Sequence, residues 1–214
     1  MSSITYEPSR SEKFSGLIYE PFLALGERRG MRDRRRELLA AARGRVLEIG
    51  AGTGLNLPHY PAGVDLVVTE PIAGMRDRLQ RRAQEEGIDA SVVAAGADEL
   101  PFPDDSFDTV VSTMVLCTVP DPHVAISEIQ RVLRPGGRLL FIEHVLADTP
   151  RLSRWQQRLA DPWAAFADGC RCDRDTLAHL RSAGLRLTGV RRDAWRGMPG
   201  IVGPLVIGAA EARS

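Results

Sequence analysis

Three alternating glycines after a short apolar segment constrain this chain more than any other feature. Residues 46–49 read Val-Leu-Glu-Ile and predict a buried strand, and glycines follow at positions 50, 52 and 54. Glycine tolerates positive φ and allows a ligand to approach the backbone closely. We therefore expect a tight turn from a first strand into a helix, whose N-terminal N–H groups would face a nucleotide-type ligand.

The spacing of these glycines argues against a dinucleotide. The G-x-G-x-x-G fingerprint needs glycine at position 55, where the chain has Leu55. Glu48 puts a carboxylate inside the apolar strand, which favours a cationic ligand over a pyrophosphate. A second apolar run, residues 65–69, ends in Glu70, which could accept hydrogen bonds from both hydroxyls of a ribose. The two features predict a cationic nucleoside; a glycine turn with a purely structural role is the alternative.

Length and composition fit one α/β domain. The chain has 214 residues and a net charge of zero, which gives no general attraction to nucleic acid or membranes. Its three cysteines, Cys117, Cys170 and Cys172, without a signal peptide favour a reducing cytoplasm. Two neighbouring cysteines without a second pair do not make a zinc site, so no metal is expected. No apolar run approaches the roughly 18 residues of a membrane span.

The rest of the pattern alternates strands with helices, as in a doubly wound sheet. We expect N-terminal lid helices over 1–43, a main region over 44–214 and a substrate-side helical insertion over 150–180, all in one domain. The arginines at 28–36 indicate a solvated face or a contact with a membrane surface. The expected later strands are 91–94, 107–113, 138–143, 184–190 and 204–210, and the expected helices between them are 73–86 and 122–133.

From about residue 44 to 210 the chain resembles the class I S-adenosylmethionine (SAM)-dependent methyltransferases. The run E-x-G-x-G-x-G from Glu48 and the run L-R-P-G-G-R-L from Leu133 carry this general likeness. The resemblance implies a Rossmann-like, seven-stranded, mostly parallel sheet with an antiparallel C-terminal hairpin, SAM as cofactor and S-adenosylhomocysteine as product. A closer similarity to the methyltransferase-like thiol methyltransferases of animals and bacteria comes from 143–145, 155–157, 161–162 and 168–170, with 93–96 and 115–117.

The family implies which residues would hold the cofactor. Tyr19 follows Phe14 with the spacing of the quinone and phospholipid methyltransferases, in which the tyrosine lies over the cofactor; packing within the lid is its alternative role. In the matching adenine loop Gly96 replaces the family's aspartate, which leaves the Ala97 backbone and Asp98. The predicted cofactor contacts are Tyr19, Glu48, Gly50, Ala51, Gly52, Gly54, Asn56, Glu70, Pro71, Ala97, Asp98, Thr113 and Leu116.

Titratable residues at the end of the fifth expected strand indicate the catalytic end of the site. His144, with an ordinary pKa of about 6.5, can accept a proton at neutral pH. Glu143 precedes it, and Asp168 is the second candidate base. Cys117, Trp155 and Trp163 are predicted to line the substrate; a buried structural thiol and packing of the insertion are the alternatives.

These features predict in-line transfer of the SAM methyl group to a small, largely apolar acceptor, preferably a thiol. The alternatives are a lipid, quinone or natural-product O-, N- or C-methyltransferase and a non-enzymatic SAM-binding regulatory protein. We expect a cytoplasmic monomer or homodimer that binds no nucleic acid. The animal thiol methyltransferases begin with a hydrophobic anchor that this sequence does not show, so we expect no stable membrane anchor and leave a peripheral contact open.

Overall fold

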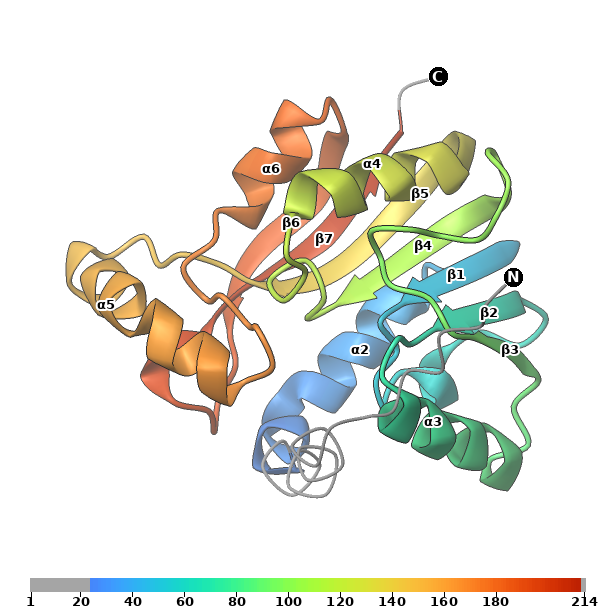
Figure 1. Ribbon diagram of the computed structural model, residues 1–214, viewed down its shortest axis with the longest axis horizontal. Coiled ribbons are helices and arrows are strands. Elements are labelled where there is room, and N and C mark those ends of the chain that lie inside the picture. The colour runs from blue at the N-terminus through green and yellow to red at the C-terminus, as the bar shows by residue number, and fades with distance from the viewer. Residues whose placement is uncertain (1–23, 213–214) are drawn as a thin grey trace, which may run out of the picture.

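One twisted sheet organises the part of the chain that the computed structural model describes, residues 24–212 (Figure 1). Its seven strands lie in the order β3-β2-β1-β4-β5-β7-β6. The strands from β1 to β5 pair in parallel, whereas β7 runs antiparallel to both β5 and β6. This arrangement confirms the expected Rossmann-like sheet with its antiparallel C-terminal hairpin.

Strands and helices alternate along the chain as the sequence predicts. The strands are β1 Arg45–Ile49, β2 Asp65–Thr69, β3 Ala90–Val93, β4 Phe107–Thr113, β5 Leu133–His144, β6 Arg186–Ala194 and β7 Pro204–Glu211. The helices are η1 Glu27–Met31, α2 Arg32–Leu39, η2 Leu57–His59, α3 Ala73–Glu85, α4 Pro122–Val132, α5 Pro150–Phe166, α6 Thr176–Ser182 and η3 Gly200–Val202.

The prediction of an α-helix directly after the glycine loop is wrong. Only the three-residue 3₁₀ turn η2, Leu57–His59, follows the loop. Pro58 fits the first turn of a helix, but Pro61 has no N–H to donate and would end an α-helix there. A helix N-terminus therefore does not form the ligand-facing part of this loop, and the backbone of the glycines has to do so.

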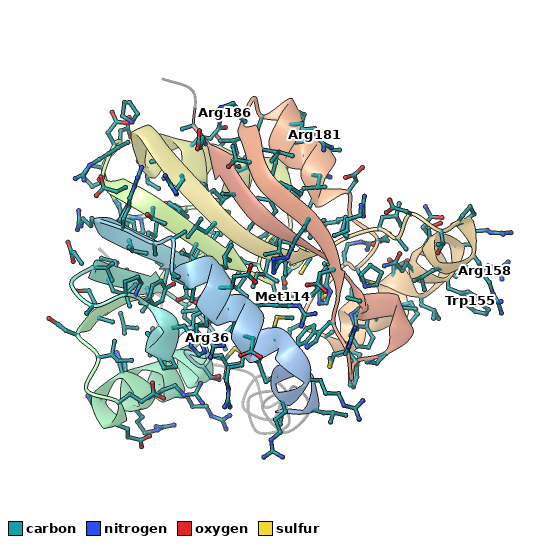
Figure 2. The ribbon with its side chains drawn as sticks, turned by 180° about the vertical axis from the view of Figure 1, so that it is seen from behind. Arg36, Met114, Trp155, Arg158, Arg181 and Arg186 are labelled. Carbon is teal, nitrogen blue, oxygen red and sulfur yellow. The ribbon has the colours of Figure 1, made fainter. Side chains whose placement is uncertain are left out.

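Side chains along β5 alternate between the two faces of the sheet. Phe141 lies in the core cluster shared with α4, and Ile142 lies in the cluster shared with α2. Figure 1 shows α4 in front of the sheet, and Figure 2, seen from behind, shows α2 in front of it. Glu143 and His144 are neighbours in sequence but continue this alternation, so they serve opposite faces.

Part of the arginine cluster fastens the N-terminal helices to the domain. Arg34 Nε lies 2.7 Å from Asp193 Oδ2 on β6, and this hydrogen bond holds the pKa of Asp193 at about 2. Arg35 is buried and pairs with Glu27 at 3.0 Å. Arg34 and Arg35 are therefore structural, and the solvated face expected for the cluster does not include them. Within residues 24–212, no helix is long and apolar enough to cross a membrane.

Candidate active site

The glycine loop forms an open backbone cradle at the carboxyl end of β1. Gly50 has φ 55° and Gly52 has φ 59°, a region that L-residues rarely adopt. A Cβ on Gly50 would come within 2.8 Å of Val115 Cγ2, whereas a Cβ on Gly52 would meet no atom within 4 Å. Gly50 therefore allows close packing with the loop after β4, and Gly52 leaves space that a ligand can fill.

Glu70 stands at the tip of β2 beside this cradle. Its side chain is almost fully buried, and its carboxylate accepts the Gly52 N–H at 2.8 Å and the Ile72 N–H at 2.9 Å. Burial raises the pKa of Glu70, although these two hydrogen bonds oppose the rise. Each carboxylate oxygen keeps a second lone pair, so the fixed carboxylate can still accept hydroxyl groups of a sugar. Pro71 follows it and is exposed.

Glu48 anchors a buried network instead of standing open to a ligand. Its carboxylate oxygens accept hydrogen bonds from Asn56 Nδ2 at 2.8 Å and from the Tyr60 hydroxyl at 2.7 Å. Burial raises the pKa of Glu48 to about 7, and the two hydrogen bonds limit the rise. Asn56 Nδ2 also donates to Thr113 Oγ1 at 3.0 Å. The predicted residues Glu48, Asn56 and Thr113 thus meet, while Tyr60 was missed because an isolated tyrosine in a loop gives no sequence signal.

The same network reaches the N-terminal helices through one buried arginine. Arg35 Nη1 donates to Asn56 Oδ1 at 2.8 Å while its other nitrogens bind Glu27. Movement of η1 and α2 would therefore shift Arg35 and disturb its hydrogen bond to Asn56. Tyr19, predicted to cover the cofactor, lies outside the described residues.

The loop after β3 brings two more predicted residues to this edge. Ala97 is buried and Asp98 is exposed. A Cβ on Gly96 would lie 2.4 Å from Asp98 Oδ1, the end of an exposed side chain that can rotate away from it. The Asp98 carboxylate thus lies next to Gly96, where the family has an aspartate.

Glu143 holds the loop that follows β4. It is fully buried, and its carboxylate accepts the Ser112 hydroxyl at 2.6 Å and the backbone N–H groups of Val115, Leu116 and Cys117 at 3.1 Å each. Burial raises the pKa of Glu143 against these four hydrogen bonds. With its oxygens engaged in this way, Glu143 has contacts suited to positioning Leu116 and Cys117. Its predicted part in proton transfer stays a prediction.

His144 lies on the other face, against the segment between β6 and β7. Its ring stacks on Trp195 with centroids 5.6 Å apart, and burial lowers the pKa of His144 to about 4. Within the described chain, neither His144 Nδ1 nor Trp195 Nε1 has a hydrogen-bond partner. His144 is therefore neutral at pH 7 and offers a buried lone pair.

The predicted substrate residues do not all come together. Cys117 is buried and its sulfur lies 3.9 Å from Cys170 Sγ, while Trp163 is half-buried and helps to lower the pKa of Cys170. Trp155 is different, because 49% of it is exposed and the Arg158 guanidinium lies 6.0 Å from its ring. Figure 2 shows Trp155 and Arg158 at the outer end of α5, far from Met114.

Asp168 and Gln156 hold the insertion in different ways. Asp168 is exposed and has φ 45°, and Gly169 follows with φ 85°, so these two residues turn the chain back after α5. Gln156 is fully buried, and its amide group reaches four backbone groups of the surrounding loops. Gln156 belongs to the 155–157 cluster that carries the family resemblance, but the sequence did not indicate that it binds backbone groups of several loops.

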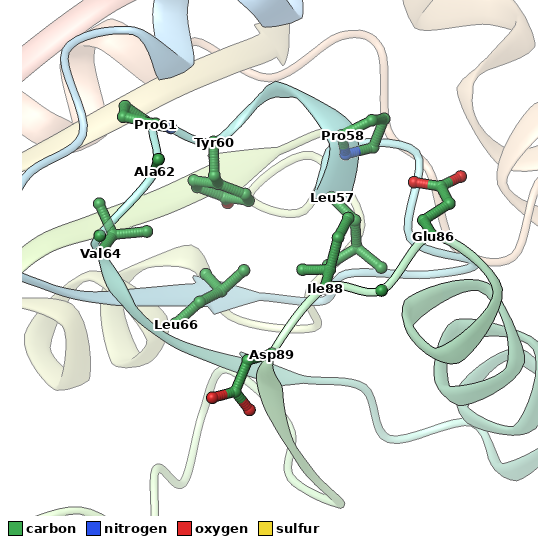
Figure 3. Close-up of a pocket in the computed structure, with 12 residues that line it drawn as sticks. Leu57, Pro58, Tyr60, Pro61, Ala62, Val64, Leu66, Glu86, Ile88 and Asp89 are labelled. Carbon is green, nitrogen blue, oxygen red and sulfur yellow. The ribbon is translucent and has the colours of Figure 1, made fainter.

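A surface hollow near the glycine loop lies outside this arrangement. It runs between the segment after η2 and the turn from α3 to β3, and Leu57, Tyr60, Leu66, Glu86 and Asp89 are among the residues that line it (Figure 3). The Tyr60 hydroxyl is bound to Glu48. The hollow contains none of the predicted cofactor contacts, so we assign it no ligand.

The fold, the open glycine cradle and the fixed acid on β2 together define a class of protein. A family model described as a methyltransferase domain matches residues 47–141, and the chain belongs to the class I SAM-dependent methyltransferases. Its cofactor is SAM. Gly52 leaves room beside the Glu70 carboxylate, which can accept the hydroxyl groups of a nucleoside.

Particular relatives agree with this family. Human thiol S-methyltransferase TMT1B is 37% identical over 167 residues, covering 72% of this chain and 68% of the relative. A phosphatidylethanolamine N-methyltransferase from Cereibacter sphaeroides is 37% identical over 119 residues, covering 55% and 59%. A SAM-dependent methyltransferase from Thermotoga maritima shares the fold, with a TM-score of 0.70, 21% identity and coverage of 94% of this chain and 97% of the other.

Proposed function

We propose that the chain transfers the SAM methyl group to the sulfur of a small, largely apolar thiol. The observation that carries this proposal is the 37% identity to human thiol S-methyltransferase TMT1B, which extends over 72% of the chain. When bound, SAM supplies a methyl group on a sulfonium, which is already a good electrophile. The chain's own residues then have to bind SAM and the thiol, align them and exclude water. Alignment supplies most of the rate.

In this proposal the predicted cofactor residues contact different parts of SAM. Glu70 accepts the ribose hydroxyls, and the backbone of Gly52 lies against the cofactor. Ala97 and Asp98 contact the adenine. Asn56, which is bound to Glu48, and Thr113, which is bound to Asn56, border the inner end of the cofactor site. Support comes from the contacts that already orient these groups: the Gly52 N–H to Glu70 at 2.8 Å and Asn56 to Glu48 at 2.8 Å.

His144 is the proposed proton acceptor for the thiol. A thiolate is the competent nucleophile, and a free thiol with a pKa of about 8.5 is only a few per cent ionised at pH 7. His144 stays neutral there because burial lowers its pKa to about 4, and its Nδ1 has no partner within the described residues. Such a weak base assists the thiol through a hydrogen bond more than by taking the proton completely.

Replacing His144 with phenylalanine keeps a ring against Trp195 and removes both nitrogens. We expect kcat/KM for a thiol to fall about tenfold at pH 7, because the variant loses the hydrogen bond that helps a mostly protonated thiol to react. The loss should vanish above about pH 9, where the acceptor ionises by itself. A pH profile of both proteins measures this, and a loss that stays constant with pH would contradict the role. Asp168→Asn, measured in parallel, tests the second candidate base.

The acceptor class is tested by turnover with labelled SAM. Hydrogen sulfide and short alkyl thiols should give S-adenosylhomocysteine, while amines, phenols and phospholipids should give far less. A protein that binds SAM but turns over none of these acceptors would be a regulatory SAM-binding protein. Preferential turnover of a phenol, quinone or amine would replace the thiol assignment.

A lipid acceptor is the second candidate because one face of α5 is apolar and basic. Trp155 and Leu159 are exposed there, beside Arg151, Arg154 and Arg158. The phosphatidylethanolamine N-methyltransferase from Cereibacter sphaeroides is a relative at 37% identity. Turnover of phosphatidylethanolamine in vesicles, with no turnover of thiols, would favour this candidate over the first.

The proposal also carries the remaining expectations about the protein as a whole. It assigns 1–43 to a lid and 44–214 to the catalytic region, with 150–180 on the substrate side. It places the enzyme in the cytoplasm as a monomer or homodimer that needs no nucleic acid. The unpaired thiols of Cys117, Cys170 and Cys172 support a reducing compartment.

A further inference from the structure

Two cysteines from distant parts of the chain meet beyond the carboxyl end of β4. Cys117 follows that strand and is fully buried, whereas Cys170 follows α5 and is partly exposed. Their sulfur atoms lie 3.9 Å apart. Methyl transfer as proposed above gives neither thiol a bond to form or break.

Hydrogen bonds from Arg171 and Arg174 hold the two loops together. The Arg171 N–H donates to the Cys117 carbonyl at 2.8 Å, and Arg174 Nη1 donates to the Leu116 carbonyl at 2.7 Å. On the other side Glu143 accepts the Cys117 N–H at 3.1 Å. The loop that carries Cys117 is thus held by Glu143 on one side and by two arginines that follow Cys170 on the other.

The two thiols are chemically unequal. The hydrogen bond with Cys117 lowers the pKa of Cys170, and the Trp163 indole and the Arg174 charge act in the same direction against burial. The same hydrogen bond, together with burial, raises the pKa of Cys117. An accessible thiol with a lowered pKa is suited to attack, and a buried protonated thiol beside it is suited to resolve the product.

We propose that Cys170 and Cys117 form a thiol–disulfide exchange site for small aliphatic disulfides. The Cys170 thiolate attacks one sulfur of R–S–S–R, forming Cys170–S–S–R and releasing RS⁻. Cys117 then attacks Cys170 Sγ, which forms a Cys117–Cys170 disulfide and releases the second RS⁻. The Cys117 proton goes to this departing thiolate.

One round of this exchange needs no reactant other than the protein dithiol and the small disulfide. The protein dithiol is oxidised by two electrons, and the small disulfide is reduced to two thiols. A further round requires an external dithiol to reduce the protein. The sulfur–sulfur distance has to shorten from 3.9 Å to about 2.05 Å, the length of a disulfide bond. The exchange does not depend on which acceptor is methylated, so the two proposals can fail separately.

The test uses the reduced full chain with bis(2-hydroxyethyl) disulfide, followed by acid quench, intact mass and peptide mapping. The unmodified sequence should lose two hydrogen atoms and show a peptide linking Cys117 to Cys170. Cys117→Ser should instead retain one hydroxyethylthio group on Cys170, because no resolving thiol remains. Cys170→Ser should show neither product.

Cys172→Ser is the matched control. Cys172 lies two residues from Cys170 but is buried, and burial raises its pKa to about 12, so this variant should react as the unmodified chain does. Melting temperature and SAM affinity verify that each variant is folded. Alkylation of the unmodified chain by iodoacetamide gives a second measurement, in which Cys170 should react first. An adduct on Cys172, a Cys117→Ser variant without adduct on Cys170, or first alkylation elsewhere would overturn the proposal.

Discussion

Replacing Gln156 with leucine should lower the free energy of unfolding by about 3–5 kcal/mol, among the largest effects of a single substitution. Gln156 Oε1 accepts the Ala147 N–H at 2.7 Å. Its Nε2 donates to the carbonyls of Cys172 and Ile201 at 2.9 Å each and of Val145 at 3.2 Å. Leucine has a similar shape but satisfies none of these backbone groups, and each unsatisfied buried group costs about 1–3 kcal/mol.

Gln157 supplies a control of the same chemistry one residue away. It lies on the exposed side of α5, so Gln157→Leu should change the free energy of unfolding by less than about 0.5 kcal/mol. Urea unfolding of the three proteins, with equal m-values, measures the difference. Equal stability of the two variants would show that the Gln156 contacts do not hold α5 to the ends of β5 and η3.

The difference between the two glutamines also shows where sequence reasoning stops. Periodicity and glycine spacing predicted where the strands fall along the chain and the turn at Gly50 and Gly52, because these depend on local pattern, whereas the sheet arrangement was implied by the family resemblance. The burial of Gln156 depends on loops from 145–147, 172 and 201 that meet only in the fold. No local pattern predicts such a meeting.

The catalytic end was the least predictable for the same reason. Adjacent titratable residues in the sequence, Glu143 and His144, suggested one joint function, but strand alternation sends them to opposite faces. Trp155 and Trp163 lie on the same helix, yet Trp155 is on its outer side. By contrast, Glu48 lies within β1 and Glu70 directly follows β2, as their positions in the sequence indicated, because strands of the parallel core set both places.

Replacing Glu70 with alanine should weaken SAM binding by about 1–3 kcal/mol, the usual range for hydrogen bonds to a charged group. The carboxylate is held by the Gly52 and Ile72 N–H groups, so its position beside the cradle does not need the ligand to form. Titration calorimetry with SAM measures the change. Glu85→Ala, an exposed acid on the neighbouring helix α3, should leave the affinity unchanged.

The pH dependence separates this role from a structural one. Burial raises the pKa of Glu70, so protonation of the empty site begins at a higher pH than for an ordinary glutamate. The ionised carboxylate is the stronger acceptor for ribose hydroxyls. SAM affinity should therefore decrease as the pH falls through that raised pKa, and Glu70→Ala should remove this dependence while Glu85→Ala keeps it. A Glu70→Ala protein that binds SAM as tightly as the unmodified chain at every pH would separate Glu70 from the ribose and leave the glycine cradle to bind the nucleoside alone.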